Sequence, residues 1–526
     1  MLKLTRLVAV VAALAALSTA ALAERVLRVD EVAVGELDPA KASDYADSML
    51  MFNVYDTLVL PRQGGPGHVP HLAESWEQSG NDYTFKLRSD VKFQSGNSMT
   101  AEDVVFSMER MQTIGQGLSF LFVDVESIEA LDAHTVRISL SRPYAPFLSS
   151  LVRLPIVDKA LVMANLGEGE GEMKDWGQAY LSANGGGSGA YMVESHNPQD
   201  ETVMVKNPGY FLPISDMAPD RVRLRYGLEA ATVRTLVAQG EHDITSQWLP
   251  PEVKRALVSD GNQILTEGGT GSFYFKLNSQ KAPFDDVHCR LAVANAYDYT
   301  SGLKLVEIAE GVAEGTPSTG AISVGMFGAN PADQTLSRDL DGAKAHLAQC
   351  MHDPADFSIE ISWIAEVPVE ERFALLLQAN LAEIGIKSSI TKIPWAVFSS
   401  NVESAENTPH VSQLFVTAVT GDPDTLLWGQ YHSTAAGTWQ SAEHLNDSEV
   451  DSLLEAGRTA TTDEGREEAY AALNQRLQAI AASVYVFDRQ TVFVGRPGIN
   501  VPALSDPEMA FGLDSMGFAF RLIEVE

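Results

Sequence analysis

Segments with the periodicity of β-strands alternate with segments with the periodicity of α-helices along nearly the whole sequence. In residues 83–88, Tyr83, Phe85 and Leu87 are apolar and the residues between them are polar, which is the pattern of a half-buried strand. A helix is predicted further on, because Thr100 can cap its first turn and Asp103 stands at the reciprocal capping position. Strands and helices that alternate in this way predict α/β layers.

The same alternation recurs in the rest of the chain. The strand-like segments are 24–34, 136–140, 190–194 and 484–494, and the helix-like segments are 232–239, 285–297, 371–384 and 470–480. Gly240 and Gly385 directly follow two of these helices, as glycine commonly does at helix C-termini. A chain of 526 residues is too long for one hydrophobic core, so the sequence predicts at least two α/β lobes.

The N-terminus has the parts of a secretory signal peptide. Lys3 and Arg6 are positive, residues 7–17 are apolar, and residues 21–23 read Ala-Leu-Ala, so we expect cleavage after Ala23. The apolar run is too short to span a bilayer, and no later stretch approaches the roughly 18 apolar residues that a membrane helix needs. No cysteine follows the run to carry a lipid. The mature protein is therefore expected to be free in the periplasm and not itself membrane-spanning.

The acidity of the chain argues against nucleic-acid partners. The formal net charge is -33, and removal of residues 1–23 with Lys3 and Arg6 takes it by two charges to -35. A surface of this sign repels phosphate backbones. Solubility outside the cell explains the acidity, and a bias toward cationic ligands stays an open alternative.

Cys289 and Cys350 are the only cysteines in the sequence. In an oxidising compartment the two thiols can form one disulfide. Buried free thiols are the alternative, because the sequence supplies no geometry for the pair. Two cysteines are too few for paired CxxC metal motifs.

Common catalytic motifs are absent from the sequence. It contains no GxxxxGK[ST] nucleotide loop, no HExxH zinc motif and no GxSxG nucleophile elbow. His68 and His71 lie in a loop rich in glycine and proline without a third ligand at metal spacing, which favours an exposed loop over a metal site. Asp422 and Asp424 flank a proline, which is typical of a turn, with an acid and base pair as the functional alternative. We therefore expect no enzyme activity, no metal and no cofactor.

Six segments resemble a single protein family and follow that family's order. The run AESWEQSGNDYTFKLRSDVKFQSGNSMTAEDVVFSMERM at 73–111 resembles the signature region of the peptide/nickel/opine class, family 5, of ABC-importer solute-binding proteins. The others are GSGAYMVESHNPQDETVMVKNPGYF at 187–211, LVAQGEHDI at 236–244, APFDDVHCRLAVANAYD at 282–298, LQANLAEIGI at 377–386 and GDPDTLLWGQYHS at 421–433. Together the segments are distributed over most of the mature chain.

This resemblance implies a two-lobed, type II periplasmic-binding-protein fold of the large class with an extra subdomain. Residues 24–268 and 488–526 would form the first lobe with that subdomain, and residues 269–487 the second. The chain would cross between the lobes at the glycine run 268–271 and at the strand 484–494. Such crossings allow closure around a ligand. The family implies a monomer that delivers its ligand to a permease and, through it, to ATPase subunits.

The resemblance further implies capture of a short peptide or similar small solute in a cleft between the lobes. The residues expected to line this cleft are Tyr45, Phe120, Arg153, Trp248, Ser272, Tyr274, Phe415, Thr420 and Asp422. Aromatic side chains suit such a cleft because they offer apolar faces and cation–π attraction. Packing in a core is the alternative for each residue.

Two charged anchors of similar dipeptide-binding proteins are missing from this sequence. Those proteins carry an aspartate for the peptide ammonium just before the GDPD-like turn, where this chain reads Thr-Ala-Val-Thr at 417–420. They carry an arginine for the peptide carboxylate where this chain reads Ile-Ala-Glu at 364–366. A buried charge without a partner is strongly disfavoured. An opine, a cationic amine, a glycoside or a metal chelate therefore remain alternative ligands, and a secreted hydrolase or a periplasmic chaperone remain alternative functions.

Overall fold

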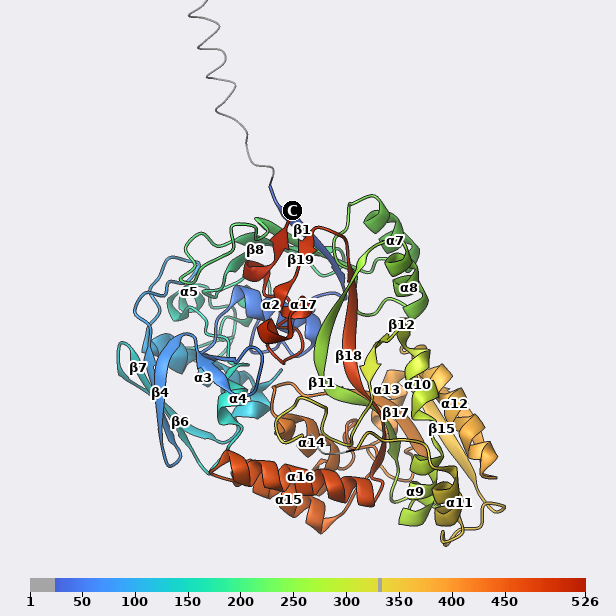
Figure 1. The fold of residues 1–526 in the computed structure, drawn as a ribbon. Helices are drawn as coiled ribbons and strands as arrows, with labels where there is room; N and C mark the ends of the chain where they lie inside the picture. The colour runs from blue at the N-terminus through green and yellow to red at the C-terminus, as the bar shows by residue number, and fades with distance from the viewer. Residues whose placement is uncertain (1–23, 330–333) are drawn as a thin grey trace, which may run out of the picture.

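The computed structural model describes residues 24–329 and 334–526. The signal peptide predicted for residues 1–23 lies outside the described residues. Two long strands, β11 (Gln263–Leu277) and β18 (Ser483–Gly495), run side by side through the middle of the molecule (Figure 1). The elements of the first half of the chain surround one end of this pair, and α15 (Ser448–Thr459) and α16 (Asp463–Ala479) lie near the other.

The first sheet builds the N-terminal part of the molecule. Its strand order is β1 (Val26–Glu31), β10 (Arg221–Tyr226), β9 (Glu201–Lys206) and β8 (Tyr191–Asn197). Strand β1 runs parallel to β10, and the other two pairs are antiparallel. The helix α2 (Tyr45–Val54) and the C-terminal residues Phe518 and Phe520 share a hydrophobic core with this sheet. The carboxyl end of β1 thereby brings Glu31 to the middle of the molecule.

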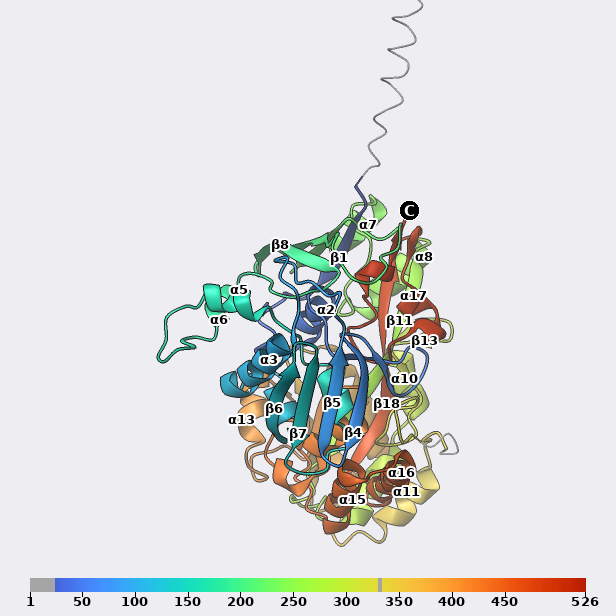
Figure 2. The same cartoon turned by 90° about the vertical axis from the view of Figure 1, so that its left-hand side faces the viewer.

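A second sheet is entirely antiparallel and forms a separate core. Its order is β4 (Ala73–Ser79), β5 (Asp82–Leu87), β7 (Thr135–Leu140) and β6 (Val125–Asp132), shown facing the viewer in Figure 2. The helix α3 (Ala101–Ile114) packs on it. The predicted alternation is confirmed, because Tyr83, Phe85 and Leu87 are buried. The predicted capping box is also confirmed, since the Thr100 backbone N–H donates to Asp103 Oδ2 at 2.8 Å.

The third sheet has six strands and organises the rest of the chain. Its order is β14 (Gly315–Thr316), β18, β11, β17 (Val411–Thr417), β15 (Ser358–Ile364) and β16 (Lys387–Ile393). Strands β15, β16 and β17 are parallel to one another, with α12 (Val369–Glu383) packed against β15 and β16. Further helices are α9 (Val287–Ala296), α10 (Tyr299–Leu305), α11 (Leu340–Leu347), α13 (Trp395–Asn401) and α14 (Pro423–Tyr431).

The remaining elements are short. They are β2 (Val59–Pro61), β3 (His68–Pro70), α4 (Phe147–Leu151), α5 (Lys159–Ala164), α6 (Gln178–Leu181), α7 (Ala230–Ala238), α8 (Pro251–Ser259), β12 (Glu307–Ala309), β13 (Val312–Ala313), β19 (Ile499–Asn500), α17 (Pro502–Ser505) and β20 (Glu524–Val525). The four helices predicted at 232–239, 285–297, 371–384 and 470–480 are confirmed as α7, α9, α12 and part of α16. None of the helices in the described ranges is both long and apolar enough to cross a membrane.

The hydrophobic cores divide at the paired strands. The fully buried residues of the two cores under the first two sheets come from 27–265 and 493–525, and those of the two cores around the third sheet come from 273–487. The pairing of β11 with β18 is interrupted between Gly268 and Ser272. This division supports the predicted lobes, residues 24–268 with 488–526 (lobe I) and residues 269–487 (lobe II). Their bounds stay a prediction.

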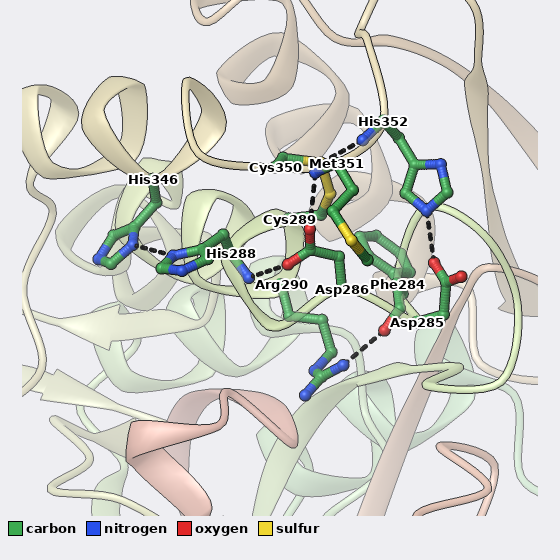
Figure 3. The surroundings of a disulfide bond; sticks show 10 residues. All are labelled: Phe284, Asp285, Asp286, His288, Cys289, Arg290, His346, Cys350, Met351 and His352. Carbon is green, nitrogen blue, oxygen red and sulfur yellow. Dashed lines mark hydrogen bonds and ion pairs between the residues drawn. A yellow bond between two sulfur atoms is a disulfide. The ribbon is translucent and has the colours of Figure 1, made fainter.

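Cys289 and Cys350 form a disulfide, so the open choice between bridge and free thiols is decided in favour of the bridge. Their Cα atoms lie 5.2 Å apart, and the bridge joins α9 to the end of α11 (Figure 3). Asp286 supports the same corner, because its carboxylate accepts the backbone N–H groups of His288 and Met351 at 2.8 and 2.6 Å. The bridge therefore attaches the outer helix of lobe II to its core.

Candidate functional site

Buried ionisable side chains gather where the two lobes meet. Glu267 lies on β11 just before the interruption, and its Oε2 accepts the Tyr45 hydroxyl at 2.8 Å while its Oε1 accepts the Gly517 N–H at 2.8 Å. Asp514 accepts the Thr270 N–H at 3.3 Å. Glu267 and Asp514 are 5 and 7 % exposed. We call Glu31, Tyr45, Arg153, Glu267, Arg489 and Asp514 the junction cluster, since charge interactions connect these side chains.

Arg153 connects the two lobes directly. It follows α4 in lobe I, and its Nε donates to the backbone carbonyl of Val419 in lobe II at 2.5 Å. Burial lowers the pKa of this guanidinium to about 10, against the opposing effect of the Asp514 and Glu267 carboxylates. A guanidinium in this position is largely removed from water, and the two carboxylates compensate for the lost hydration of its charge.

The carboxylates of the cluster are held in an environment that disfavours their charge. Burial and the neighbouring charge of Asp514 raise the pKa of Glu267 to about 7. Burial also raises the pKa of Asp514, although Arg489 and Arg153 oppose the shift. Burial raises the pKa of Glu31 to about 8, although the Val32 N–H and Arg489 oppose the shift. Ionisable groups with shifted pKa values in a cleft are candidates for a functional site.

A pocket of about 470 Å³ opens beside the cluster at the carboxyl ends of β1 and β10. Asp30 and Glu31 line it together with the aromatic residues Trp248 and Tyr226. The Trp248 side chain is 53 % exposed, and the Arg489 guanidinium lies 5.3 Å from the centre of its ring. The pocket therefore combines two carboxylates with apolar faces.

A second, smaller cavity of about 50 Å³ lies inside lobe I next to Arg153. His71 lines it and its Nε2 lies 2.7 Å from Asp56, which also accepts the hydroxyls of Ser188 and Tyr210 at 2.7 and 3.0 Å. His68 has a different neighbour, because its Nε2 lies 3.2 Å from Ser149 Oγ. Both histidines are thus engaged with different partners. The exposed loop expected around them is wrong for His71, which is only 7 % exposed.

The structure brings three of the sequence-predicted site residues to the junction. Tyr45 and Arg153 belong to the junction cluster, and Trp248 lines the adjoining pocket. Ser272 follows Glu267 on β11 but is fully buried. Its hydroxyl donates to Asp488 Oδ1 at 3.0 Å. This bond stabilises the resumption of the β11 and β18 pairing rather than presenting a group to a ligand.

Tyr274 and Phe415 lie in the cores of lobe II. Tyr274 has no exposed surface and packs edge-on against Tyr485, with ring centres 5.9 Å apart. Phe415 packs on Phe273 at 4.5 Å. Phe120 is 53 % exposed in a short 3₁₀ turn, outside both pockets. For Tyr274 and Phe415 the structure favours the packing alternative.

Thr420 and Asp422 shape the start of α14. Thr420 Oγ1 lies 3.1 Å from Thr425 Oγ1, and Asp422 caps the helix while both its carboxylate oxygens lie 2.8 Å from Arg466 Nη2. Asp424 forms a two-point ion pair with Arg458 at 2.9 Å. Each aspartate is bound to its own arginine, so the geometry supports the structural interpretation of this turn over an acid and base pair.

Sequence reasoning missed four members of the junction cluster. Glu31 had a usable signal, since Asp30 and Glu31 are adjacent acids inside an apolar strand. Glu267 also had one, because it immediately precedes the glycine run at 268–271. Arg489 and Asp514 had none, because only the fold brings them beside Glu267.

The described residues contain one group of three side chains whose spacing could suit a metal ion, made up of Asp286, Cys289 and Cys350. Both sulfur atoms of that group are joined in the disulfide (Figure 3). A disulfide sulfur is not the thiolate that binds metals. The geometry of this corner is therefore structural in the oxidised protein.

Comparison with known proteins places the chain among secreted binding proteins. The family model described as "Bacterial extracellular solute-binding proteins, family 5 Middle" matches residues 67–438. The probable D,D-dipeptide-binding periplasmic protein DdpA of Escherichia coli is 27% identical over 497 residues, covering 92% of each chain. Heme-binding protein A of Haemophilus influenzae is 28% identical over 453 residues, covering 79% of this chain and 78% of the relative.

A solved structure agrees with these relatives. The periplasmic binding protein DppA of Helicobacter pylori, in complex with the peptide STSA, superposes with a TM-score of 0.76 at 24% identity, covering 96% of this chain and 99% of that one. The likeness confirms the expected α/β binding-protein fold. With a family model that spans most of the sequence and a fold that matches throughout, the chain belongs to family 5 of the bacterial extracellular solute-binding proteins.

Proposed function

We propose that this protein is the exported, periplasmic binding component of an ABC importer, which holds a short peptide or similar small solute between its lobes. The observation that carries the proposal is the junction cluster, where buried ionisable groups of lobe I meet the crossing strands and Arg153 bonds to lobe II. A ligand at this place contacts both lobes at once. Its binding energy would then favour the closed arrangement.

The relatives support a peptide as the first ligand to test. One is named for D,D-dipeptides, one structure holds the peptide STSA, and another relative is named for heme. An opine, a cationic amine, a glycoside or a metal chelate stay as alternatives. The closed protein would present its ligand to a permease whose ATPase subunits drive transport.

Tyr45, Arg153 and Trp248 are the predicted binding residues that their positions support best. Arg153 offers donors beyond the one that Val419 accepts. Trp248 offers an exposed aromatic face and Tyr45 a phenol within the cluster. We propose that these residues bind and orient the ligand and that none acts as a catalyst. In this role the shifted pKa values of the junction cluster result from burial of ionisable groups that the bound ligand would contact.

The test begins with the protein as purified. Mass spectrometry of the solute released by denaturation identifies what was carried, and calorimetry with that solute on the stripped protein is expected to show saturable binding without product formation. Small-angle scattering should show a smaller radius of gyration on binding. Turnover of the bound solute would contradict the proposal and establish a hydrolase, and weak binding of many unrelated polypeptides would favour a chaperone.

A further inference from the structure

We propose that the pocket beside Glu31 binds a primary alkylammonium group of the transported solute. The inference rests on the proposed function and specifies the ligand chemistry at one place in the site. The shared chemistry is R–NH₃⁺, supplied by the amino terminus of a peptide, by a lysine-like side chain or by a free diamine.

The charge of the pocket lining has one sign. Its titratable residues are Asp30, Glu31 and Tyr226, and no lysine, arginine or histidine lines it. Ser246 and Gln199 add neutral polar groups. A volume of about 470 Å³ exceeds the need of an ammonium group and leaves room for the carbon chain attached to it.

Glu31 contributes an acceptor that no described protein group uses. Its Oε1 accepts the Val32 N–H at 2.9 Å, whereas its Oε2 is buried without a hydrogen-bond partner and the residue is only 2 % exposed. A buried acceptor left unpaired destabilises the protein. Asp30 stands next to it, with Oδ2 accepting the Ser246 N–H at 3.4 Å. An ammonium group has three donors and can serve both carboxylates.

The cations near this pocket have other partners. The groups that act electrostatically on Glu31 are Asp30, Asp44, Tyr45, Tyr226, Lys254 and Arg489. Lys254 Nζ donates to Glu314 and to the Gln247 carbonyl. Arg489 donates to the Gln247 side chain and stacks on Trp248. Arg225 acts on Asp30 from β10. None of these cations donates a hydrogen bond to Glu31 Oε2.

The aromatic side chains of the pocket would pack against the carbon chain that carries the ammonium group. Trp248 lines the pocket with about half of its surface exposed, and Tyr226 also lines it but is mostly buried. Methylene groups next to an ammonium pack well on an indole face, and the charge itself gains cation–π attraction. An anionic or purely neutral ligand would leave Glu31 and Asp30 without compensation.

Binding should be linked to proton release. Burial raises the pKa of Glu31 to about 8 and that of Asp30 to about 7, so both carboxyls carry protons part of the time at neutral pH. A bound ammonium favours the ionised carboxylates and lowers both pKa values. Association of the cation therefore expels protons, and affinity should rise as the pH rises from 6 to 7.5, a range in which an amino-terminal ammonium with an ordinary pKa of about 8 keeps most of its charge.

The probes are matched pairs that differ by one ammonium group. Trialanine is compared with N-acetyl-trialanine, and N-acetyl-Ala-Lys-Ala with the same peptide acetylated at the lysine Nζ, which separates amino-terminal from side-chain ammonium groups. Free 1,5-diaminopentane tests the third source. Each is titrated by calorimetry into stripped mature protein at pH 7 and at pH 6, where the probes keep their ammonium charge, in two buffers with different ionisation enthalpies.

In at least one pair, the ammonium-bearing probe is expected to bind at least tenfold more tightly and to release protons. Glu31→Gln should weaken that probe at least tenfold and leave its acetylated partner within twofold. Glu370→Gln makes the same change at another buried carboxyl, 1 % exposed in lobe II, and should leave both probes within twofold. Proton release by the wild-type protein needs no variant and stands even where a variant folds poorly.

Equal binding within each pair, or a Glu31→Gln variant with unchanged affinity for an ammonium-bearing probe, overturns the inference and leaves the importer proposal standing. The same holds for a copurified solute that binds tightly and carries no ammonium group. Lack of saturable binding for every probe together with lack of any copurified solute overturns both.

Discussion

Single residues at the lobe junction carry most of the evidence for function. Glu31 lies at the end of a regular strand, yet its carboxyl is buried and its Oε2 has no hydrogen-bond partner among the described residues. Glu267 and Asp514 are similarly buried, and Tyr45 and Arg153 bond within the same region. A core built only for stability would place apolar side chains here. The local loss of stability is consistent with a site that a ligand completes.

The pH dependence of stability tests this view at Glu31. Its folded pKa of about 8 lies above the ordinary value of 4.5, so the native state holds the proton more tightly than the unfolded state does. Stability from this group is fully present below pH 4.5 and is lost as the pH rises through 8. Glu31→Gln cannot ionise and is expected to remove this loss, worth on the order of 5 kcal/mol for a shift from 4.5 to about 8.

The measurement is urea unfolding of ligand-free wild type and Glu31→Gln at pH 5 and pH 8.5. The variant should gain stability relative to wild type between the two values. A difference between the two proteins that stays constant over this range would contradict the assigned burial of the carboxyl.

At the scale of elements, β11 needs glycine at two positions of the run 268–271, because the backbones of β17 and β18 lie very close to it there. A Cβ atom at Gly271 would lie 2.1 Å from the Val416 carbonyl oxygen, and one at Gly269 would lie 2.3 Å from the Arg489 carbonyl oxygen. A Cβ at Gly268 would meet nothing within 4 Å. The run thus lets β17, β11 and β18 approach one another at the interruption in their pairing.

Substitution by alanine separates these positions. Gly271→Ala forces a backbone shift and is expected to lower the free energy of unfolding by more than about 2 kcal/mol. Gly268→Ala is the matched control and should change it by less than about 0.5 kcal/mol. Thermal unfolding followed by circular dichroism distinguishes the two. Equal melting temperatures would show that β11 does not approach its neighbours as described.

The disulfide between α9 and the end of α11 makes a second element-scale prediction. It closes a loop across a sequence separation of 61 residues, so removing it enlarges the conformational freedom of the unfolded chain. Replacing Cys289 and Cys350 together by serine is expected to cost about 2–5 kcal/mol. Chemical unfolding of the double variant and of reduced wild type should give the same loss. Mass mapping of unreduced peptides checks the bridge itself, and two free thiols would refute it.

For the whole molecule, we propose that the contacts between the predicted lobes control opening and closure. Arg153 bonds to Val419, and the backbone N–H of Ala145 donates to the carbonyl of Arg458 at 2.8 Å. In this proposal the strands β11 and β18, which continue from one lobe into the other, act as the hinge, and these contacts hold the closed state. Two rigid halves joined this way are a typical arrangement for hinge closure around a ligand.

Arg153→Met is expected to loosen that closure. The variant loses the donor to Val419 and removes one of the cations near Glu267 and Asp514, so the radius of gyration of the ligand-free protein should increase and solute affinity should fall about tenfold. Arg142→Met removes an exposed pair with Asp124 and serves as the control. Scattering and calorimetry measure the two effects. Unchanged values for Arg153→Met would remove Arg153 from the site.

Local patterns in the sequence determined the elements of this protein. The alternation at 83–88, the capping box at Thr100 and the amphipathic helix at 371–384 are short-range effects of side-chain spacing, and the structure confirms them. The resemblance of six segments extended this to the α/β binding-protein fold. Tyr45, Arg153 and Trp248 were named from that resemblance, and the structure places them in or beside the junction cluster, while their role in binding stays a prediction.

Only the tertiary structure decided which charged groups meet. Glu31, Glu267 and Asp514 are far apart in the chain, and their desolvation depends on the walls that other segments supply. The same reason moved Tyr274 into a core and bound Asp422 to Arg466. Burial and long-range contact are properties of the packed chain, so spacing along the sequence carries no signal for them.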